Sequence, residues 1–118
     1  MLAGAVLGFL GVAAGAFGAH ALAAKLSPAM KAIWETAARY HLLHAILLVV
    51  VAVMRRREAT RALAVAHWAL LLGVLIFSGT LYLLAVTGVR WLGAITPIGG
   101  TALLVGWAAI AVHAFKMR

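Results

Sequence analysis

The chain has 118 residues, of which 67% are hydrophobic and only 10% charged, and its mean hydropathy is +1.14. A soluble domain of this size cannot bury so much apolar surface, because small globules leave a large share of the chain exposed to water. The formal net charge of +8 does not indicate a nucleic-acid partner, because the basic residues lie at the ends of apolar runs. The chain has no cysteine, which excludes disulfides, thiolate metal sites and a cysteine nucleophile.

Four apolar segments follow one another along the chain. They cover about residues 2–24, 33–54, 62–86 and 91–115. Each has about 20 to 25 residues, the length needed to cross ~30 Å of hydrocarbon. The connectors are too short to hold a second domain. We therefore predict a single all-α domain, an integral membrane four-helix bundle.

The ends of two segments carry local signals. Ser27 is the expected N-cap of the second helix, and Pro28 fits its first helical position. At the end of the first segment, Ala19-His20-Ala21 has the small-x-small form of a signal-peptide cleavage site. A cleaved leader is the alternative for this segment, but no basic residue precedes the apolar run, which is long enough to span.

The basic residues predict the orientation of the helices. One side of the bundle carries six Lys and Arg residues in its connector and tail: Arg55, Arg56, Arg57, Arg61, Lys116 and Arg118. The other side carries three: Lys25, Lys31 and Arg90. Because lysine and arginine accumulate in cytoplasmic loops, both termini are expected in the cytoplasm, with the first and third helices running outward.

The first segment contains a regular series of glycines. They are spaced 4, 3, 4 and 3 residues apart, at Gly4, Gly8, Gly11, Gly15 and Gly18. No hydrophobic force drives helices together in lipid, so close backbone approach and van der Waals packing must do so. This glycine seam predicts a groove for another helix of the same chain. The spacing leaves open the alternative that a second copy of the chain fills it.

Polar side chains within the segments collect in the predicted outer half of the membrane. Isolated polar groups in hydrocarbon are costly and usually face the bundle interior or a water-filled cavity. We therefore predict one polar cluster that opens toward the outer surface, made of His20, Tyr40, His44, Ser78, Tyr82 and Thr96, with Pro97 at a similar height. The alternative is interhelical hydrogen bonding, which we favour for Ser78 and Thr96.

The histidines differ in what their positions predict. His20 lies ~200° around the helix from Gly18, so it is expected to face a neighbour other than the one in the glycine seam. His44 shares an arc of ~100° with Tyr40 and His41 on the second helix, although His41 is the weaker ligand candidate. His67 and His113 lie near the cytoplasmic ends of their helices and are expected at the interface.

Two further patterns lie in the second and fourth segments. Glu35 and Arg39 are four residues apart, which predicts a local ion pair at the outer interface. A proton-coupling role for Glu35 is the weaker alternative. Pro97 cannot donate a hydrogen bond to the carbonyl of Gly93, so the stretch 96–100 is expected to interrupt or kink the fourth helix. Such a break can also expose backbone groups to a ligand.

Five motifs occur in one order along the chain: GAFGAH at 15–20, YHLLH at 40–44, FSGTLY at 77–82, TPIGG at 96–100 and GW at 106–107. With them the chain resembles the family of small inner-membrane proteins called domain of unknown function 423, which is related to transmembrane protein 256 of animals. It departs from the family pattern at His41, where a glutamine-like residue is expected, and at Thr80, where serine is common. The resemblance implies a four-helix integral protein of a bacterial plasma membrane and no particular activity.

Three classes of function follow from these residues. The first is binding or translocation of a small solute, ion or lipid head group by the polar cluster, which would need a homo-oligomer to enclose a pathway. The second is an accessory subunit that packs against a larger membrane complex. The third, an enzyme or a metal or haem site on His20 and His44, has too few ligands. No catalytic constellation is visible, so we expect no enzyme, metal or cofactor.

Overall fold

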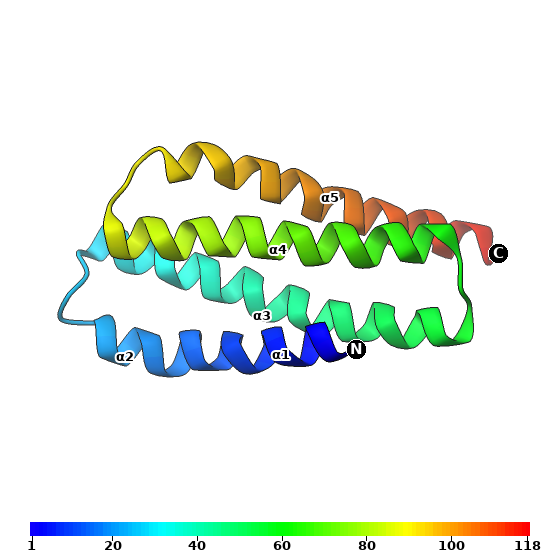
Figure 1. Cartoon of the computed structure of the whole chain (residues 1–118), viewed down its shortest axis with the longest axis horizontal. Coiled ribbons are helices and arrows are strands. Elements are labelled where there is room, and N and C mark those ends of the chain that lie inside the picture. Colours follow the sequence, from blue (N-terminus) through cyan, green and yellow to red (C-terminus); the bar gives the residue numbers. More distant parts are fainter.

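The computed structural model describes residues 1–118, apart from the side chain of Ala19. Short connectors join helices that run back and forth along one long axis (Figure 1). The helices are α1 (Leu2–Val12), η1 (Ala13–Gly18), α2 (Ala19–Leu22), α3 (Pro28–Arg57), α4 (Arg61–Thr87) and α5 (Leu92–Lys116). Because α1, η1 and α2 continue one another, four helical spans are long and apolar enough to cross a membrane: Leu2–Leu22, Pro28–Arg57, Arg61–Thr87 and Leu92–Lys116. The predicted all-helical fold with four apolar spans is confirmed.

Side-chain caps and one glycine set the ends of the central helices. Ser27 Oγ accepts a hydrogen bond from the backbone N–H of Met30 at 3.2 Å, and Pro28 occupies the first helical position, as predicted. Because this cap precedes the apolar run, α3 starts earlier than hydropathy alone indicates. Thr60 caps α4 in the same way. α4 ends at Thr87, and its C-cap is Gly88, whose φ of 70° lies in the left-handed region that glycine adopts without strain.

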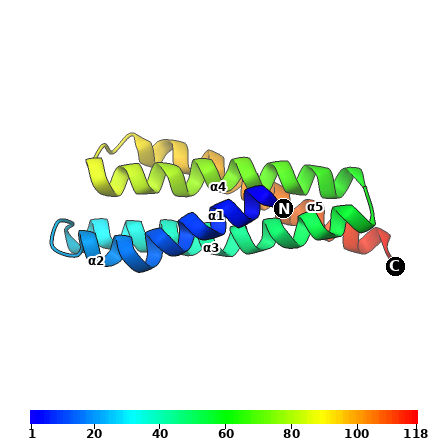
Figure 2. The same ribbon diagram turned by 60° about the horizontal axis from the view of Figure 1, so that its bottom comes forward.

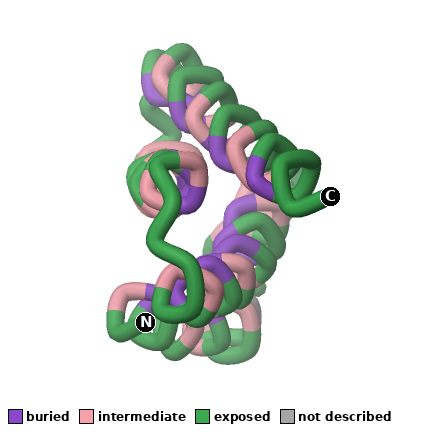
Figure 3. Tube along the Cα trace, turned by 90° about the vertical axis from the view of Figure 1, so that its right-hand side faces the viewer, coloured by how far each residue is buried: buried purple, intermediate pink, exposed green. Residues whose placement is uncertain are grey.

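The helices pack mainly in a row (Figures 1 and 2). The first span packs on α3, α3 on α4, and α4 on α5. The core lies along the contact between α3 and α4, and α1 and α5 each contribute one residue to it: Leu7, Ala45, Leu48, Val51, Ala66, Leu70, Val74 and Leu103. Figure 3 shows that buried residues lie on the faces that the helices turn toward one another.

All five glycines of the first span face α3. The residues nearest to them on α3 run in the opposite order: Val49, Ala45, Leu42 (nearest to both Gly11 and Gly15) and Trp34. The backbone of α3 comes closest at Gly4, where a Cβ atom would lie 2.9 Å from the backbone nitrogen of Val49 and 3.1 Å from the carbonyl oxygen of Ala45. A helix of the same chain therefore fills the glycine seam.

A second close approach joins α4 to α5. A Cβ atom on Gly99 would lie 2.8 Å from the Cα of Phe77 and 2.9 Å from the carbonyl oxygen of Gly73. Gly99 thus lets two backbones touch, and α5 runs without a break from Leu92 to Lys116 with Pro97 inside it. Residues 96–100 therefore do not interrupt this helix, and a kink at Pro97 stays a prediction. Pro97 leaves the carbonyl of Gly93 without its intrahelical donor, and the helix continues through this one missing bond.

Gly99→Ala should destabilise the protein, because the added methyl group meets the backbone of α4 rather than a movable side chain. We expect a loss of about 1–3 kcal/mol, the usual cost of overpacking a tight contact. The measurement is thermal unfolding in a mild detergent, followed by circular dichroism.

Gly79→Ala is the matched control on α4. A Cβ atom at Gly79 meets nothing within 4 Å. Alanine should therefore raise the unfolding temperature slightly, because it restricts the unfolded chain and favours helix. Equal unfolding temperatures for the two variants would show that the contact between Gly99 and Phe77 does not hold these helices together.

Candidate functional site

The contact between α3 and α4 divides the polar side chains of the spans into two groups. On one side, His44 and Tyr40 line a cavity of about 650 Å³ between α3 and α5. On the other, His41 and Tyr82 line a cavity of about 160 Å³ among α1, α3 and α4. The structure therefore divides the cluster predicted from the sequence: Tyr40 and His44 line the larger cavity, Ser78 and Tyr82 line the smaller one, and His20 and Thr96 line neither.

Aromatic rings form much of the wall of the larger cavity. Tyr40 stacks on His44 with ring centroids 5.9 Å apart, and its ring also lies 4.7 Å from that of Phe77 on α4. The rings of His44 and of Trp107 on α5 pack edge to face, with centroids 6.2 Å apart. Arg39 and Pro97 complete this wall from α3 and α5.

Two hydrogen bonds fix the protonation state of His44. Its Nδ1 lies 2.7 Å from the carbonyl oxygen of Tyr40, which can only accept, so Nδ1 carries a proton. Its Nε2 lies 3.2 Å from the indole nitrogen of Trp107, which can only donate, so Nε2 carries none. His44 is therefore neutral while both bonds hold.

The smaller cavity lies beside a chain of side chains that joins three helices. The Nδ1 atom of His41 lies 2.9 Å from the hydroxyl oxygen of Tyr82 on α4. The ring of Tyr82 packs on that of Trp34, with centroids 4.6 Å apart. The indole N–H of Trp34 in turn donates to the carbonyl oxygen of Ala14 at 2.9 Å.

Ala14 belongs to η1, the π-helical turn that interrupts the expected regular helix. The wider turn of a π-helix breaks the register of a strict heptad, and such turns are frequent at functional sites. The indole of Trp34 occupies the space beside it, because a Cβ atom on Gly18 would lie 2.7 Å from the Trp34 ring. Gly18, the second glycine of GAFGAH, therefore makes room for an aromatic side chain from α3.

Ser78 and Thr96 act in hydrogen bonds between helices. The buried hydroxyl of Ser78 donates to the carbonyl oxygen of Ala37 on α3 at 2.8 Å. The hydroxyl of Thr96 lies 2.7 Å from that of Thr80 on α4. These contacts fit the interhelical role that the sequence favoured over ligand binding.

His20 lies apart from both groups. It is exposed on α2 and lines neither cavity. Gly18 contacts Trp34, which precedes His44 by about 15 Å along α3. The structure does not bring His20 to His44, so these two residues do not form the start of a shared metal or haem site.

The expected ion pair between Glu35 and Arg39 is absent from the described part of the chain. Both side chains are exposed. Arg39 instead lines the larger cavity.

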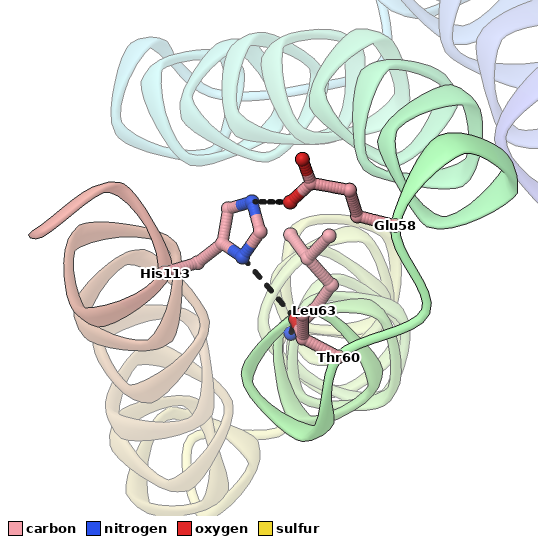
Figure 4. Close-up of polar contacts among 4 residues, drawn as sticks. All are labelled: Glu58, Thr60, Leu63 and His113. Atoms are coloured by element: carbon pink, nitrogen blue, oxygen red, sulfur yellow. Dashed lines mark hydrogen bonds and ion pairs between the residues drawn. The ribbon is translucent and has the colours of Figure 1, made fainter. Parts of the chain in front are cut away.

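The ion pair that the structure does show lies at the other end of the helices (Figure 4). The Nε2 atom of His113 is 3.7 Å from Glu58 Oε2, and its Nδ1 is 3.2 Å from Thr60 Oγ1. Thr60 Oγ1 also accepts from the N–H of Leu63. His113 is buried, and it ties the connector between α3 and α4 to the last turn of α5. His67 is half-buried and lies against the edge of Trp68.

Sequence reasoning missed the hydrogen bonds of Trp34 and Trp107 and the link at His113. Trp107 stood in the GW motif, which indicated a special position but not a partner for His44. Trp34 had no signal of its own beyond the glycine that receives it. A histidine and a carboxylate at the same end of adjacent helices could have indicated the contact between His113 and Glu58.

Comparison of the sequence with known proteins places this chain in a family. The family model described as "Protein of unknown function (DUF423)" matches residues 14–100. A UPF0382 membrane protein of Staphylococcus haemolyticus is 42% identical over 98% of this chain and 94% of its own length. The UPF0382 membrane protein YwdK of Bacillus subtilis is 40% identical over 98% of this chain and 95% of its own length.

No solved structure matches the chain. The family match covers most of the sequence, and the relatives align over almost their whole length. The names of these membrane-protein relatives and the four apolar spans agree that this is a multi-pass membrane protein. The chain therefore belongs to the DUF423 family of membrane proteins.

Proposed function

We propose that the protein binds an anionic lipid in the cavity between α3 and α5, with Arg39 holding the charged head group. The observation that carries the proposal is an arginine that lines a cavity within a membrane span, with no ion pair to it in the described part of the chain. Arg39 lies about 16 Å from the start of α3. Ionisable residues at such positions usually mark a ligand or ion site.

The polar groups around this cavity favour an anion. Both ring nitrogens of His44 are engaged, and the hydroxyl of Thr101 donates to the carbonyl oxygen of Pro97 at 2.8 Å. The guanidinium of Arg39 and the hydroxyl of Tyr40 are left to bind a ligand. A guanidinium donates in a planar fork that matches the oxygens of a phosphate group.

The remaining walls favour an acyl chain. Leucines at 43, 103 and 104 and the ring of Phe77 line the cavity. Its volume of about 650 Å³ lies in the range of small-molecule sites, so it can hold part of a lipid rather than a whole one. A charged group at one end of an apolar cavity matches the two ends of an anionic phospholipid.

We further propose that both termini lie in the cytoplasm and that the membrane is the bacterial plasma membrane. The connector between α3 and α4 and the C-terminus lie at the same end of the helices, and the other two connectors lie at the opposite end (Figure 1). This arrangement gathers six basic residues at the first end and three at the second, which supports a cytoplasmic location for the first. Arg39 then lies in the outer half of the membrane.

Arg39→Gln should lower the preference for anionic lipid. We expect the purified wild-type protein to retain phosphatidylglycerol in preference to phosphatidylcholine from an equal mixture. In the variant this preference should be about tenfold lower, because a charge-assisted contact of about 1.4 kcal/mol corresponds to a factor of ten in affinity. Native mass spectrometry of the protein released from detergent measures both lipids at once.

Arg90→Gln is the control, because it removes the same charge from the exposed connector between α4 and α5, outside the cavity. This variant should retain lipid as the wild type does. If Arg39→Gln retains phosphatidylglycerol as well as Arg90→Gln does, the lipid site is not at this arginine.

The orientation can be tested with single cysteines, because the chain has none of its own. Ala24→Cys and Met117→Cys place exposed thiols at opposite ends without changing the charge. In intact cells a membrane-impermeant maleimide should label residue 24 and should reach residue 117 only after permeabilisation. The reverse pattern would place the termini outside.

A further inference from the structure

A further hollow lies at the ends of the helices, outside the two cavities of the spans. Its volume is about 480 Å³, which lies within the range of small-molecule sites. The connector between α3 and α4 contributes Glu58 and Thr60 to its walls, and the first turn of α4 contributes Arg61. The last turn of α5 contributes His113 and Lys116. We call this space the terminal hollow.

The polar groups on one side of the terminal hollow are already engaged (Figure 4). Thr60 Oγ1 accepts a hydrogen bond from the N–H of Leu63 and lies 3.2 Å from Nδ1 of His113. Nε2 of the same ring lies 3.7 Å from Glu58 Oε2. The side chain of His113 is 4% exposed, so the packing around it holds the ring in place. The one carboxylate that lines the hollow is therefore held against a buried ring.

Arg61 and Lys116 are the charged side chains left to meet a ligand. Neither forms an ion pair with the described residues. The start of α4 and the end of α5 both border the hollow, and helix dipoles have opposite signs at these two ends. The side-chain charges therefore decide which ligand fits. Two cations from different helices in one small hollow favour an anion with several oxygens.

We propose that the terminal hollow binds a phosphate monoester, with Arg61 and Lys116 holding its terminal oxygens. A phosphate monoester carries a charge of about −1.5 to −2 near pH 7 and presents three acceptor oxygens, so both cations can contact it at once. The guanidinium donates in a planar fork, and the ammonium acts as a compact charge. A phosphate diester binds more weakly, because it has less charge and fewer free oxygens.

His113 is a positioning residue for this site and acts through Glu58. The carboxylate of Glu58 lines the same hollow as the two cations and would pair with them if its side chain were free to turn. The buried ring of His113 holds it instead. Without this ring, Glu58 competes with the phosphate for Arg61 and Lys116. Loss of His113 therefore weakens phosphate binding through the carboxylate that it releases.

The first test is the binding of glycerol 3-phosphate to the purified protein in phosphatidylcholine nanodiscs, measured by isothermal titration calorimetry. We expect the wild type to bind, and Arg61→Gln/Lys116→Gln to bind at least tenfold more weakly, because its charge-assisted contacts are lost. Arg56→Gln/Arg57→Gln is the control, because it removes two exposed positive charges at the same end of the helices, outside the hollow. Equal losses in the two double variants would indicate general attraction to a basic surface and overturn the proposal.

A membrane lipid and a soluble ester can both carry a phosphate monoester, and a second measurement separates them. Native mass spectrometry compares the retention of phosphatidic acid and phosphatidylglycerol by protein that carries Arg39→Gln, so that the cavity between α3 and α5 does not contribute. A preference for phosphatidic acid that Arg61→Gln/Lys116→Gln removes assigns the site to a lipid. Binding of glycerol 3-phosphate alone assigns it to a soluble ester.

Binding of neither probe overturns the proposal. That failure would leave the lipid site at Arg39 untouched, because the terminal hollow and the cavity between α3 and α5 share no lining residue. Failure of the lipid site would in turn leave the glycerol 3-phosphate result unchanged.

Two variants test the positioning role of His113. His113→Phe frees Glu58 and should bind glycerol 3-phosphate about tenfold more weakly than the wild type, whereas His113→Phe/Glu58→Gln should recover wild-type binding, because the competing carboxylate is gone. Circular dichroism checks that both variants keep their helix content. Equally weak binding by the two variants would show that His113 supports the fold and does not act through Glu58.

Discussion

The approach of one helix backbone to another determines how this protein is assembled. In lipid, exposed leucine and valine side chains gain nothing by leaving the solvent, so contacts between helices must come from close packing and from hydrogen bonds. At Gly4 the first span comes within contact of the backbone of α3, and at Gly99 α5 comes within contact of the backbone of α4. Ser78 adds a hydrogen bond between α4 and α3. These contacts hold the row of helices together without a large buried core.

The row arrangement explains why there are two cavities. α3 and α4 pack along their length, and the spans at either edge, the first span and α5, each cover one flank of that pair. The side chains that flank the pair are polar: His41 lies on the side of the first span, and His44 on the side of α5. His44 is satisfied within the protein by Trp107, whereas His41 is not satisfied at Nε2. The two histidines therefore have different chemical roles, although they are one helical turn apart.

The sequence predicts those features that depend on local signals. Hydropathy finds the four spans, and the cap at Ser27 follows from the residue types around it. Facing residues on different helices are harder to predict, because they depend on the rotation and depth of each helix. Tyr40, His41 and His44 share one arc, yet that arc is wide enough to extend on both sides of the contact with α4. The sequence predicted that the stretch 96–100, which contains Gly99, breaks the helix. The packing role of Gly99 could not be predicted, because it depends on the backbone of α4 lying at contact distance.

The most direct test of this arrangement is a disulfide between the first span and α3. A Cβ atom at Gly8 would lie 4.0 Å from that of Ala45, within the range of about 3.5–4.5 Å that a disulfide requires. The double variant Gly8→Cys/Ala45→Cys, oxidised in membranes and run on a non-reducing gel, should form an intrachain bond and remain a monomer. If the double variant forms no such bond and Gly8→Cys alone gives covalent dimers, a second copy of the chain fills the glycine seam and the account is contradicted.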